Sequence, residues 1–207
     1  MRQKRLPCIV LVVATGLLLA TPAPQLTAAP AVGANAPELK LPDIDGKERT
    51  LAEFRGRYVV LEWVNFACPF VKKHYDSGNM QRLQQAFTAK NVVWISICSS
   101  AKEKQGYFVP DQIRSMLTEK KAVPSAYLID QAGEVGKRYS AKTTPHIFII
   151  DPNGILIYAG AIDDKASTDL ADIPKAKNFV RAVLDAALAG EKVPVTSTTP
   201  YGCSVKY

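Results

Sequence analysis

The sequence predicts an α/β domain with a mixed β-sheet flanked by helices, and two patterns support this. Apolar, β-branched runs at residues 58–63, 91–97 and 126–129 are separated by segments with helical patterning. Such strand–helix–strand units form parallel sheets through right-handed crossovers. Two later runs, 146–150 and 155–158, flank the sequence Asp-Pro-Asn-Gly, which is typical of a hairpin turn. We therefore expect a parallel core with an antiparallel edge.

The other elements follow from local patterns. Residues 34–41 and the Asp45-Gly46 turn predict an extended N-terminal hairpin, and residues 50–54 predict a short helical turn. Asp111 can cap the second of the longer helices, and Gly190 can end the last one. These helices are expected after each of the first three strands and at the end of the domain, at residues 70–90, 111–120, 134–139 and 175–189.

Residues 1–29 are predicted to be a secretory signal peptide. A basic start precedes an apolar stretch of about 15 residues, short of the roughly 20 needed to span a bilayer. Small residues then offer several cleavage sites, and we expect cleavage near Ala28 or Ala29. An uncleaved N-terminal anchor is the alternative. The mature protein is expected to be exported, periplasmic or extracellular, with no membrane span.

We expect the mature chain to be one domain at residues 33–190 with a tail at 191–207. Its composition limits the partners and the redox chemistry that it can have. The net charge is +7, and three of these charges lie in the predicted signal peptide, so no nucleic-acid partner is expected. Cys8 is removed with that peptide, which leaves Cys68, Cys98 and Cys203. In an oxidising compartment this odd count indicates one pair with a leftover thiol, or a pair exchanged during turnover.

Cys68 is the strongest candidate for a reactive residue. It follows the predicted strand at 58–63 and precedes Pro69, which suits the first turn of a helix because no backbone N–H is needed there. The unpaired N–H groups and the positive end of the helix dipole favour a thiolate at such a position. The alternative is that Cys68 is a small buried hydrophobic side chain.

Four stretches carry a resemblance to known proteins: residues 62–75, 127–130, 143–151 and 200–206. They resemble the thioredoxin-like superfamily, and more narrowly its peroxiredoxin-like redoxin branch, which is related to AhpC/TSA proteins. The resemblance implies a thioredoxin-like fold from about residue 34 to the C-terminus. It also implies that Pro145 is a cis proline facing Cys68, and that the backbone of Thr144 can pair with an extended thiol substrate. An ordinary trans proline before a strand is the alternative.

The sequence departs from neighbouring families at the positions that define their chemistry. Thioredoxins carry a second cysteine three residues after the first, where this chain has Val71, so a local dithiol cycle is excluded. Typical peroxiredoxins carry a proline, a hydroxyl residue and an arginine at the positions of Leu61, Asn65 and Pro145. The amide of Asn65 can still donate a hydrogen bond to a peroxide. Weak peroxidase activity and thiol–disulfide exchange therefore both stay as candidate activities.

Two cysteines are candidates to resolve an oxidised Cys68. Cys98 follows the strand at 91–97, on the same carboxyl edge of the sheet as Cys68, or it is a buried, inert thiol. Cys203 lies on a tail rich in Thr, Pro and Gly, which we expect to be irregular and able to swing. Because the tail can move to meet the sulfur, we expect Cys203 to be the partner; a disordered terminal thiol is the alternative.

Histidines and lysines near these positions are expected to have minor roles. His74 is six residues after Cys68, so a surface or supporting role is favoured over catalysis, and His146 is expected to be a hydrogen-bonded structural residue. Lys72 stands where copper-delivering relatives have a second cysteine, so no metal site is expected. Lys72 and Lys73 either add positive potential near the thiolate or are solvated on the helix face.

Together these features predict a thiol-dependent oxidoreductase that needs no cofactor. Cys68 is the expected nucleophile towards a peroxide, with Cys203 or Cys98 as the resolving thiol and an external thiol reductant, such as a thioredoxin-like protein, reopening the disulfide. Asn65, Thr144 and Pro145 are the expected substrate-binding residues. The alternatives are thiol–disulfide exchange on protein substrates, or a non-catalytic binding module in which Cys68 and Cys203 form a structural disulfide.

Overall fold

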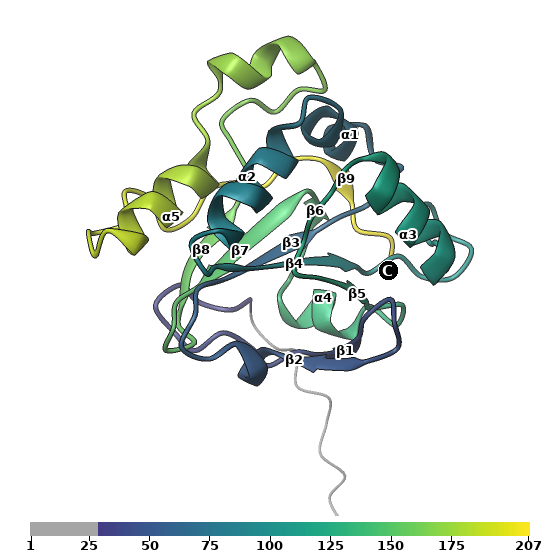
Figure 1. Ribbon diagram of the computed structural model, residues 1–207, viewed down its shortest axis with the longest axis horizontal. Helices are drawn as coiled ribbons and strands as arrows, with labels where there is room; N and C mark the ends of the chain where they lie inside the picture. Colours follow the sequence, from purple (N-terminus) through teal and green to yellow (C-terminus); the bar gives the residue numbers. More distant parts are fainter. Residues whose placement is uncertain (1–28) are drawn as a thin grey trace, which may run out of the picture.

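A five-stranded mixed sheet lies at the centre of the computed structural model, which describes residues 29–207 (Figure 1). The strand order is β5–β4–β3–β7–β8. Strands β3, β4 and β5 are parallel, whereas β7 and β8 run antiparallel to their neighbours. The predicted parallel core with an antiparallel edge is confirmed. The strands are β3 (Val59–Trp63), β4 (Val93–Cys98), β5 (Ala126–Ile129), β7 (His146–Ile150) and β8 (Leu156–Gly160).

Strand β3 is the central strand, and all five of its residues are buried. A strand covered on both faces reads as a nearly continuous apolar run, which is why this segment was recognisable from sequence. Its side chains alternate between two hydrophobic clusters: Val60 packs on one face, and Leu61 and Trp63 pack on the other. The exception is Glu62, a carboxylic acid with no exposed surface in the middle of this strand.

The two faces of the sheet are covered differently (Figure 1). Helices α1, α2, α3 and α5 lie over the face to which Val60 points, and α4, η1 and the β1–β2 hairpin lie over the other. The predicted N-terminal hairpin and helical turn are therefore present. The bounds are α1 (Pro69–Asp76), α2 (Asn79–Thr88), α3 (Pro110–Glu119), α4 (Glu134–Arg138), α5 (Phe179–Leu188), η1 (Leu51–Phe54), β1 (Lys40–Pro42) and β2 (Glu48–Thr50).

Three helix predictions were wrong in detail. The single helix expected at 70–90 is two helices, because Gly78 takes a left-handed conformation, φ 70°, and becomes the N-cap of α2. Asp111 does not cap α3; Val109 occupies the N-cap and Pro110 the first helical position. Helix α5 begins only at Phe179, because the Asn178 side chain accepts a hydrogen bond from the backbone of the first turn.

The C-terminal tail differs most from its prediction. It was expected to be irregular and able to swing, but it contains a strand, β9 (Cys203–Ser204), that pairs antiparallel with a short strand, β6 (Thr143–Thr144). Further backbone hydrogen bonds join the tail to β8 and to the loop after β4. A short helix that was not predicted, η2 (Leu170–Lys175), precedes α5. The tail is thus laid across the molecule and hydrogen-bonded along its length.

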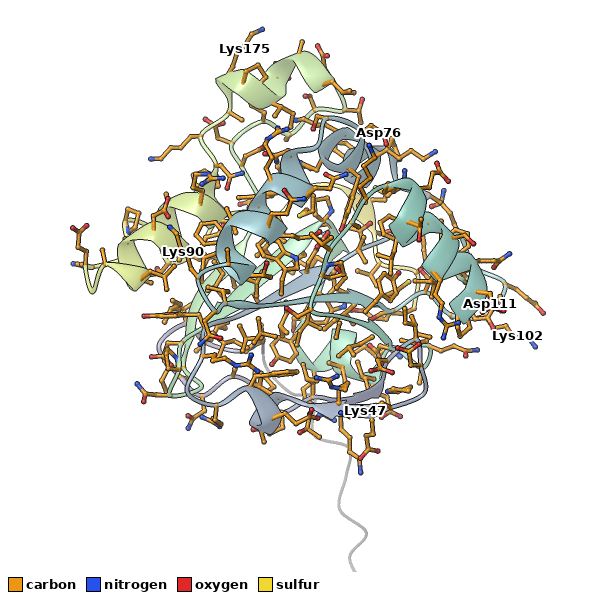
Figure 2. All side chains as sticks on the ribbon, in the orientation of Figure 1. Lys47, Asp76, Lys90, Lys102, Asp111 and Lys175 are labelled. Atoms are coloured by element: carbon orange, nitrogen blue, oxygen red, sulfur yellow. The ribbon has the colours of Figure 1, made fainter. Side chains whose placement is uncertain are left out.

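Charged side chains point outward on several sides of the molecule. Figure 2 shows Lys47, Lys90, Lys102 and Lys175 pointing outward on different sides of the molecule. Within residues 29–207, no helix combines the length and hydrophobicity needed to cross a membrane. The predicted signal peptide, residues 1–29, lies outside the described residues except for Ala29.

Candidate functional site

Cys68 is the N-cap of helix α1, as the sequence predicted. Pro69 occupies the first helical position, and the Cys68 carbonyl accepts the first intrahelical hydrogen bond, from the Lys72 N–H at 2.9 Å. The residue is completely buried. In its thiol form the Cys68 Sγ donates a hydrogen bond to the Thr144 carbonyl, with a distance of 3.2 Å between the two atoms. This contact joins the start of α1 to the proline loop that precedes β7.

The surroundings of Cys68 favour the thiolate. Burial by itself raises the pKa of the Cys68 thiol, but hydrogen bonds outweigh it, and the net result is a lowered pKa. The groups that lower it are the Cys203 side chain, the backbone N–H groups of Val71 and Cys203, and the Thr144 side chain. The Val71 N–H is one of the free donors in the first turn of α1, which is the effect expected at a helix N-terminus.

Cys203 is brought to Cys68 by the pairing of β9 with β6. In that register Cys203 lies opposite Thr144, the residue whose carbonyl accepts the hydrogen bond from Cys68. Gly202 allows this close approach: a Cβ at its position would lie 2.1 Å from the Thr144 carbonyl oxygen. The register therefore places Cys203 beside Cys68, close enough for each thiol to shift the pKa of the other.

The two thiols have opposite acid–base tendencies. Burial raises the pKa of Cys203 to about 11, together with its hydrogen bond to Cys68 and the charge on the Cys68 thiolate. Cys203 is partly exposed, whereas Cys68 lies beneath it. Of the two thiols, Cys68 therefore ionises more readily. Only the thiolate form attacks an oxidant, so this order suits Cys68 to attack and Cys203 to resolve the product.

Cys98, the second candidate for a resolving thiol, is engaged elsewhere. It is the last residue of β4 and is buried. Its Sγ donates to the Gly106 carbonyl at 3.3 Å, within the loop that follows the strand. The groups that lower the pKa of Cys68 belong instead to Cys203, Val71 and Thr144.

Asn65 does not stand free to bind a substrate. Its side-chain oxygen accepts from the Ala67 N–H at 2.9 Å, and its amide nitrogen donates to the Gln105 carbonyl at 3.2 Å. Asn65 also lies against Gly106, where an added Cβ would come within 2.4 Å of the amide carbon. The residue ties the loop before Cys68 to the loop after β4, so its contribution to the site is structural in this conformation.

The Thr144–Pro145 peptide bond is cis, as the resemblance implied. Thr144 is buried, and within the described residues its hydroxyl oxygen has no hydrogen-bond partner. It nevertheless contributes to the lowered pKa of Cys68, which places it near the sulfur. The backbone edge of Thr143 and Thr144 is occupied by β9. An extended substrate was expected at that edge.

The two histidines are both buried, which corrects the surface position considered for His74. His74 Nδ1 lies 2.9 Å from the Asn79 amide nitrogen, and its Nε2 lies 3.2 Å from the Tyr201 hydroxyl. Burial and the Lys73 charge lower the pKa of His74 to about 3, so the ring is neutral. His146 accepts a backbone hydrogen bond from Lys142 at 3.2 Å, which fits the structural role predicted for it.

The two lysines near Cys68 differ in their exposure to solvent. Lys72 is exposed on the helix surface. Lys73 is buried, and its ammonium group donates to the Lys165 carbonyl at 2.8 Å. Lys73 therefore holds the loop before η2, which neither of the two expectations for it described.

Glu62 is a buried acid that the sequence analysis did not single out, although a glutamate inside an apolar strand is a visible signal. Its carboxyl group accepts from the Tyr75 hydroxyl at 2.9 Å, the Trp94 indole at 2.8 Å and the Ser96 hydroxyl at 3.2 Å. Burial raises its pKa to about 7, against the lowering effect of these hydrogen bonds. Glu62 is the titratable group of the sheet core nearest in sequence to Cys68. In the described chain, no three His, Cys, Asp or Glu side chains cluster as a metal site would require.

Comparisons with known proteins agree with this architecture. The profile of the AhpC/TSA family matches residues 32–159. An uncharacterized conserved protein from Geobacillus kaustophilus has a similar structure, with a TM-score of 0.76 and 30% identity over 86% of this chain and 92% of that chain. A hypothetical protein from Sinorhizobium meliloti 1021 has a TM-score of 0.72 and 24% identity over 87% of this chain and 96% of that chain.

More distant structures share the fold. A putative thiol:disulfide interchange protein, DsbE, from Chlorobium tepidum has a TM-score of 0.51 and 22% identity over 63% of this chain and 85% of that chain. No curated protein matches the sequence. The central sheet and its flanking helices are therefore those of a thioredoxin-like fold.

Proposed function

The chain belongs to the AhpC/TSA family and has a thioredoxin-like fold, and from this premise we propose that it is a thiol peroxidase in which Cys68 is oxidised and Cys203 resolves. The observation that carries the proposal is the apposition of these two thiols, a lowered pKa at Cys68 beside a raised one at Cys203.

Each step of the proposed cycle balances. The Cys68 thiolate attacks one oxygen of a hydroperoxide; the O–O bond breaks, Cys68 becomes a sulfenic acid, and the leaving oxygen takes a proton to give water or an alcohol. The Cys203 sulfur then displaces the sulfenic oxygen as water and forms a Cys68–Cys203 disulfide. An external dithiol reduces this disulfide by thiol–disulfide exchange and is itself oxidised.

The proposal favours a small oxidant over an extended protein substrate. A protein disulfide would need the backbone edge at Thr143 and Thr144, and β9 of the same chain occupies that edge. Cys68 is also fully buried beneath the tail. A small peroxide needs only a local opening of the tail, whereas an extended peptide needs the β6–β9 pairing to separate.

Thiol–disulfide exchange with proteins is the second candidate function. The missing peroxide-activating groups favour it: the position of the expected arginine is Pro145, and the amide of Asn65 is already bonded to Ala67 and Gln105. Losing such donors costs about 10²–10³ in rate in comparable sites. We therefore expect peroxide reduction to be slower than in typical peroxiredoxins by about that factor.

The proposal includes export of the mature chain to an oxidising compartment. Residues 1–29 have the basic start, apolar centre and small-residue end of a signal peptide. An oxidising compartment would let the Cys68–Cys203 disulfide form and persist until a dedicated reductant arrives.

The test compares the two oxidants on one protein. The reduced mature chain is mixed with hydrogen peroxide in a stopped-flow instrument, and Cys68 sulfenic acid is trapped with dimedone in a Cys203→Ala variant. The same chain is assayed for reduction of a protein disulfide such as that of insulin. Peroxide oxidation of Cys68 with little insulin reduction supports the proposal. Rapid insulin reduction without peroxide reactivity would replace it with the second candidate.

A further inference from the structure

Tyr201, two residues before Cys203, is held by two hydrogen bonds and two ring contacts. Its hydroxyl lies 2.5 Å from Asp163 Oδ1 and 3.2 Å from His74 Nε2. Its ring lies against Phe70 of helix α1, with 5.9 Å between the ring centroids. The ammonium group of the buried Lys73 lies over the same ring, 5.9 Å from its centroid.

The direction of the hydrogen bonds is fixed by the outer partners. The Asn79 amide nitrogen can only donate, so His74 Nδ1 accepts at 2.9 Å and the ring proton is on Nε2. That proton points to the Tyr201 oxygen, and the Tyr201 hydroxyl then donates to the Asp163 carboxylate. The chain Asn79, His74, Tyr201, Asp163 therefore has one consistent direction, and each member is oriented by its neighbour.

Helix α1 therefore positions both cysteines, Cys68 directly and Cys203 through Tyr201. Cys68 is the N-cap of α1. Phe70, Lys73 and His74 are residues of α1 that contact Tyr201. Gly202 then leads directly into β9, where Cys203 lies opposite Thr144.

Resting on the proposed function, we propose that Tyr201 is a positioning residue that holds the Cys203 thiol against Cys68 and so sets the equilibrium between the dithiol and the disulfide. The disulfide can exist only while the tail is docked, because its two Cα atoms must be within about 4.4–6.8 Å. The dithiol form can release the tail. Weakening the Tyr201 anchor therefore favours the dithiol relative to the disulfide.

The test measures that equilibrium directly. Variants are built in a Cys98→Ser background so that two cysteines remain in the mature chain, and each is equilibrated with reduced and oxidised glutathione. Tyr201→Phe keeps the ring but removes the hydroxyl and leaves His74 and Asp163 without this partner. We expect the equilibrium constant for the Cys68–Cys203 disulfide to fall roughly tenfold, which corresponds to a reduction potential about 30 mV less negative.

Tyr58→Phe is the matched control. The Tyr58 hydroxyl donates to the Ala187 carbonyl at 2.9 Å, remote from the tail, so this variant also loses one tyrosine hydrogen bond. Its redox equilibrium is expected to stay within about twofold of the parent. A second readout is iodoacetamide alkylation of Cys68 in a Cys203→Ser background, where Tyr201→Phe should accelerate the reaction by loosening the tail and Tyr58→Phe should not.

Substitutions at Asp163 keep the proposal testable if Tyr201→Phe does not fold. Asp163→Asn retains an oxygen that accepts from Tyr201 and should stay near the parent, whereas Asp163→Ala should lower the disulfide equilibrium constant. Parental redox behaviour in Tyr201→Phe or in Asp163→Ala would overturn the positioning role. The measurement uses no peroxide. A failure of peroxide chemistry with an intact Tyr201 effect therefore overturns only the proposed function, and a parent that forms no Cys68–Cys203 disulfide overturns both.

Discussion

Cys68 and Cys98 occupy matching places in the fold but different chemical surroundings. Cys98 is the last residue of β4, Cys68 lies in the loop that follows the adjacent parallel strand β3, and both are buried. Each thiol donates to a backbone carbonyl, to Thr144 at 3.2 Å and to Gly106 at 3.3 Å. Only Cys68 lies at a helix N-terminus beside a second thiol. The comparison teaches that the groups surrounding the sulfur, rather than its place at the edge of the sheet, make a thiolate available.

The difference arises from how the chain leaves each strand. After β3 it turns within a few residues into α1, and Pro69 starts the helix directly after Cys68. After β4 it enters a longer loop, and α3 begins only at Pro110. The free N–H groups at the start of α3 therefore lie far along the chain from Cys98, whereas those at the start of α1 lie next to Cys68.

The largest expected effect is on turnover. Cys68→Ser should abolish peroxide consumption, by at least about 10³-fold, because the nucleophile is lost, whereas Cys98→Ser should retain most of the activity. Consumption of hydrogen peroxide with an external dithiol reductant measures both variants. Equal losses in the two variants would mean that the contrast between these cysteines is wrong.

The next effect is on stability and connectivity. Oxidation should link Cys68 to Cys203 and leave Cys98 alkylatable, because the tail already holds Cys203 at Cys68. On the chain-entropy model such a long loop stabilises the folded state by about 4–5 kcal/mol. Guanidinium unfolding of the oxidised and reduced protein measures the gain, and peptide mapping identifies the bridge. Recovery of a Cys68–Cys98 peptide would contradict the assignment.

A third prediction concerns Glu62, which is hydrogen-bonded to Trp94 and Ser96 and so joins the two cysteine-bearing strands. Burial raises its folded pKa to about 7, so the folded state retains a proton that the unfolded chain releases above its ordinary pKa. The contribution of Glu62 to stability should therefore be fully present below that ordinary pKa and be lost as the pH rises through about 7, by roughly 3 kcal/mol.

Glu62→Gln should remove most of this pH dependence, because the amide cannot ionise. Unfolding free energies at pH 5 and pH 8 measure it for both proteins. The difference between the two proteins is the contribution of Glu62, and an identical pH dependence in both would contradict its titration.

The smallest effect is on the thiol pKa itself. Cys203→Ala removes one of the donors to the Cys68 thiolate but leaves the Val71 N–H. The apparent pKa of Cys68 should therefore rise, yet stay below that of Cys203 in the parent, which is about 11. Rates of iodoacetamide modification against pH, with Cys98→Ser as the common background, measure both. An unchanged pKa in Cys203→Ala would show that the helix N-terminus alone accounts for the lowering.

The sequence predicted the sheet and the position of Cys68 at a helix N-terminus because both depend on neighbours in the chain. A buried strand at 58–63 followed by Cys68 and Pro69 places a thiol at a helix N-terminus by local geometry alone. Alternating apolar runs likewise predicted five strands of the central sheet and their directions. The sequence also pointed to Cys203 as partner, but from an expected mobility of the tail that the structure does not have.

Tertiary structure alone decided the pairing of β9 with β6, the burial of His74 and the anchoring of Tyr201 to Asp163. These contacts join segments that are far apart in sequence, and a two-residue strand or a single tyrosine carries too little local pattern to reveal its partner. A thiolate at a helix N-terminus is determined by consecutive residues, whereas the thiol that faces it depends on how a distant segment packs, and that packing follows from the whole core.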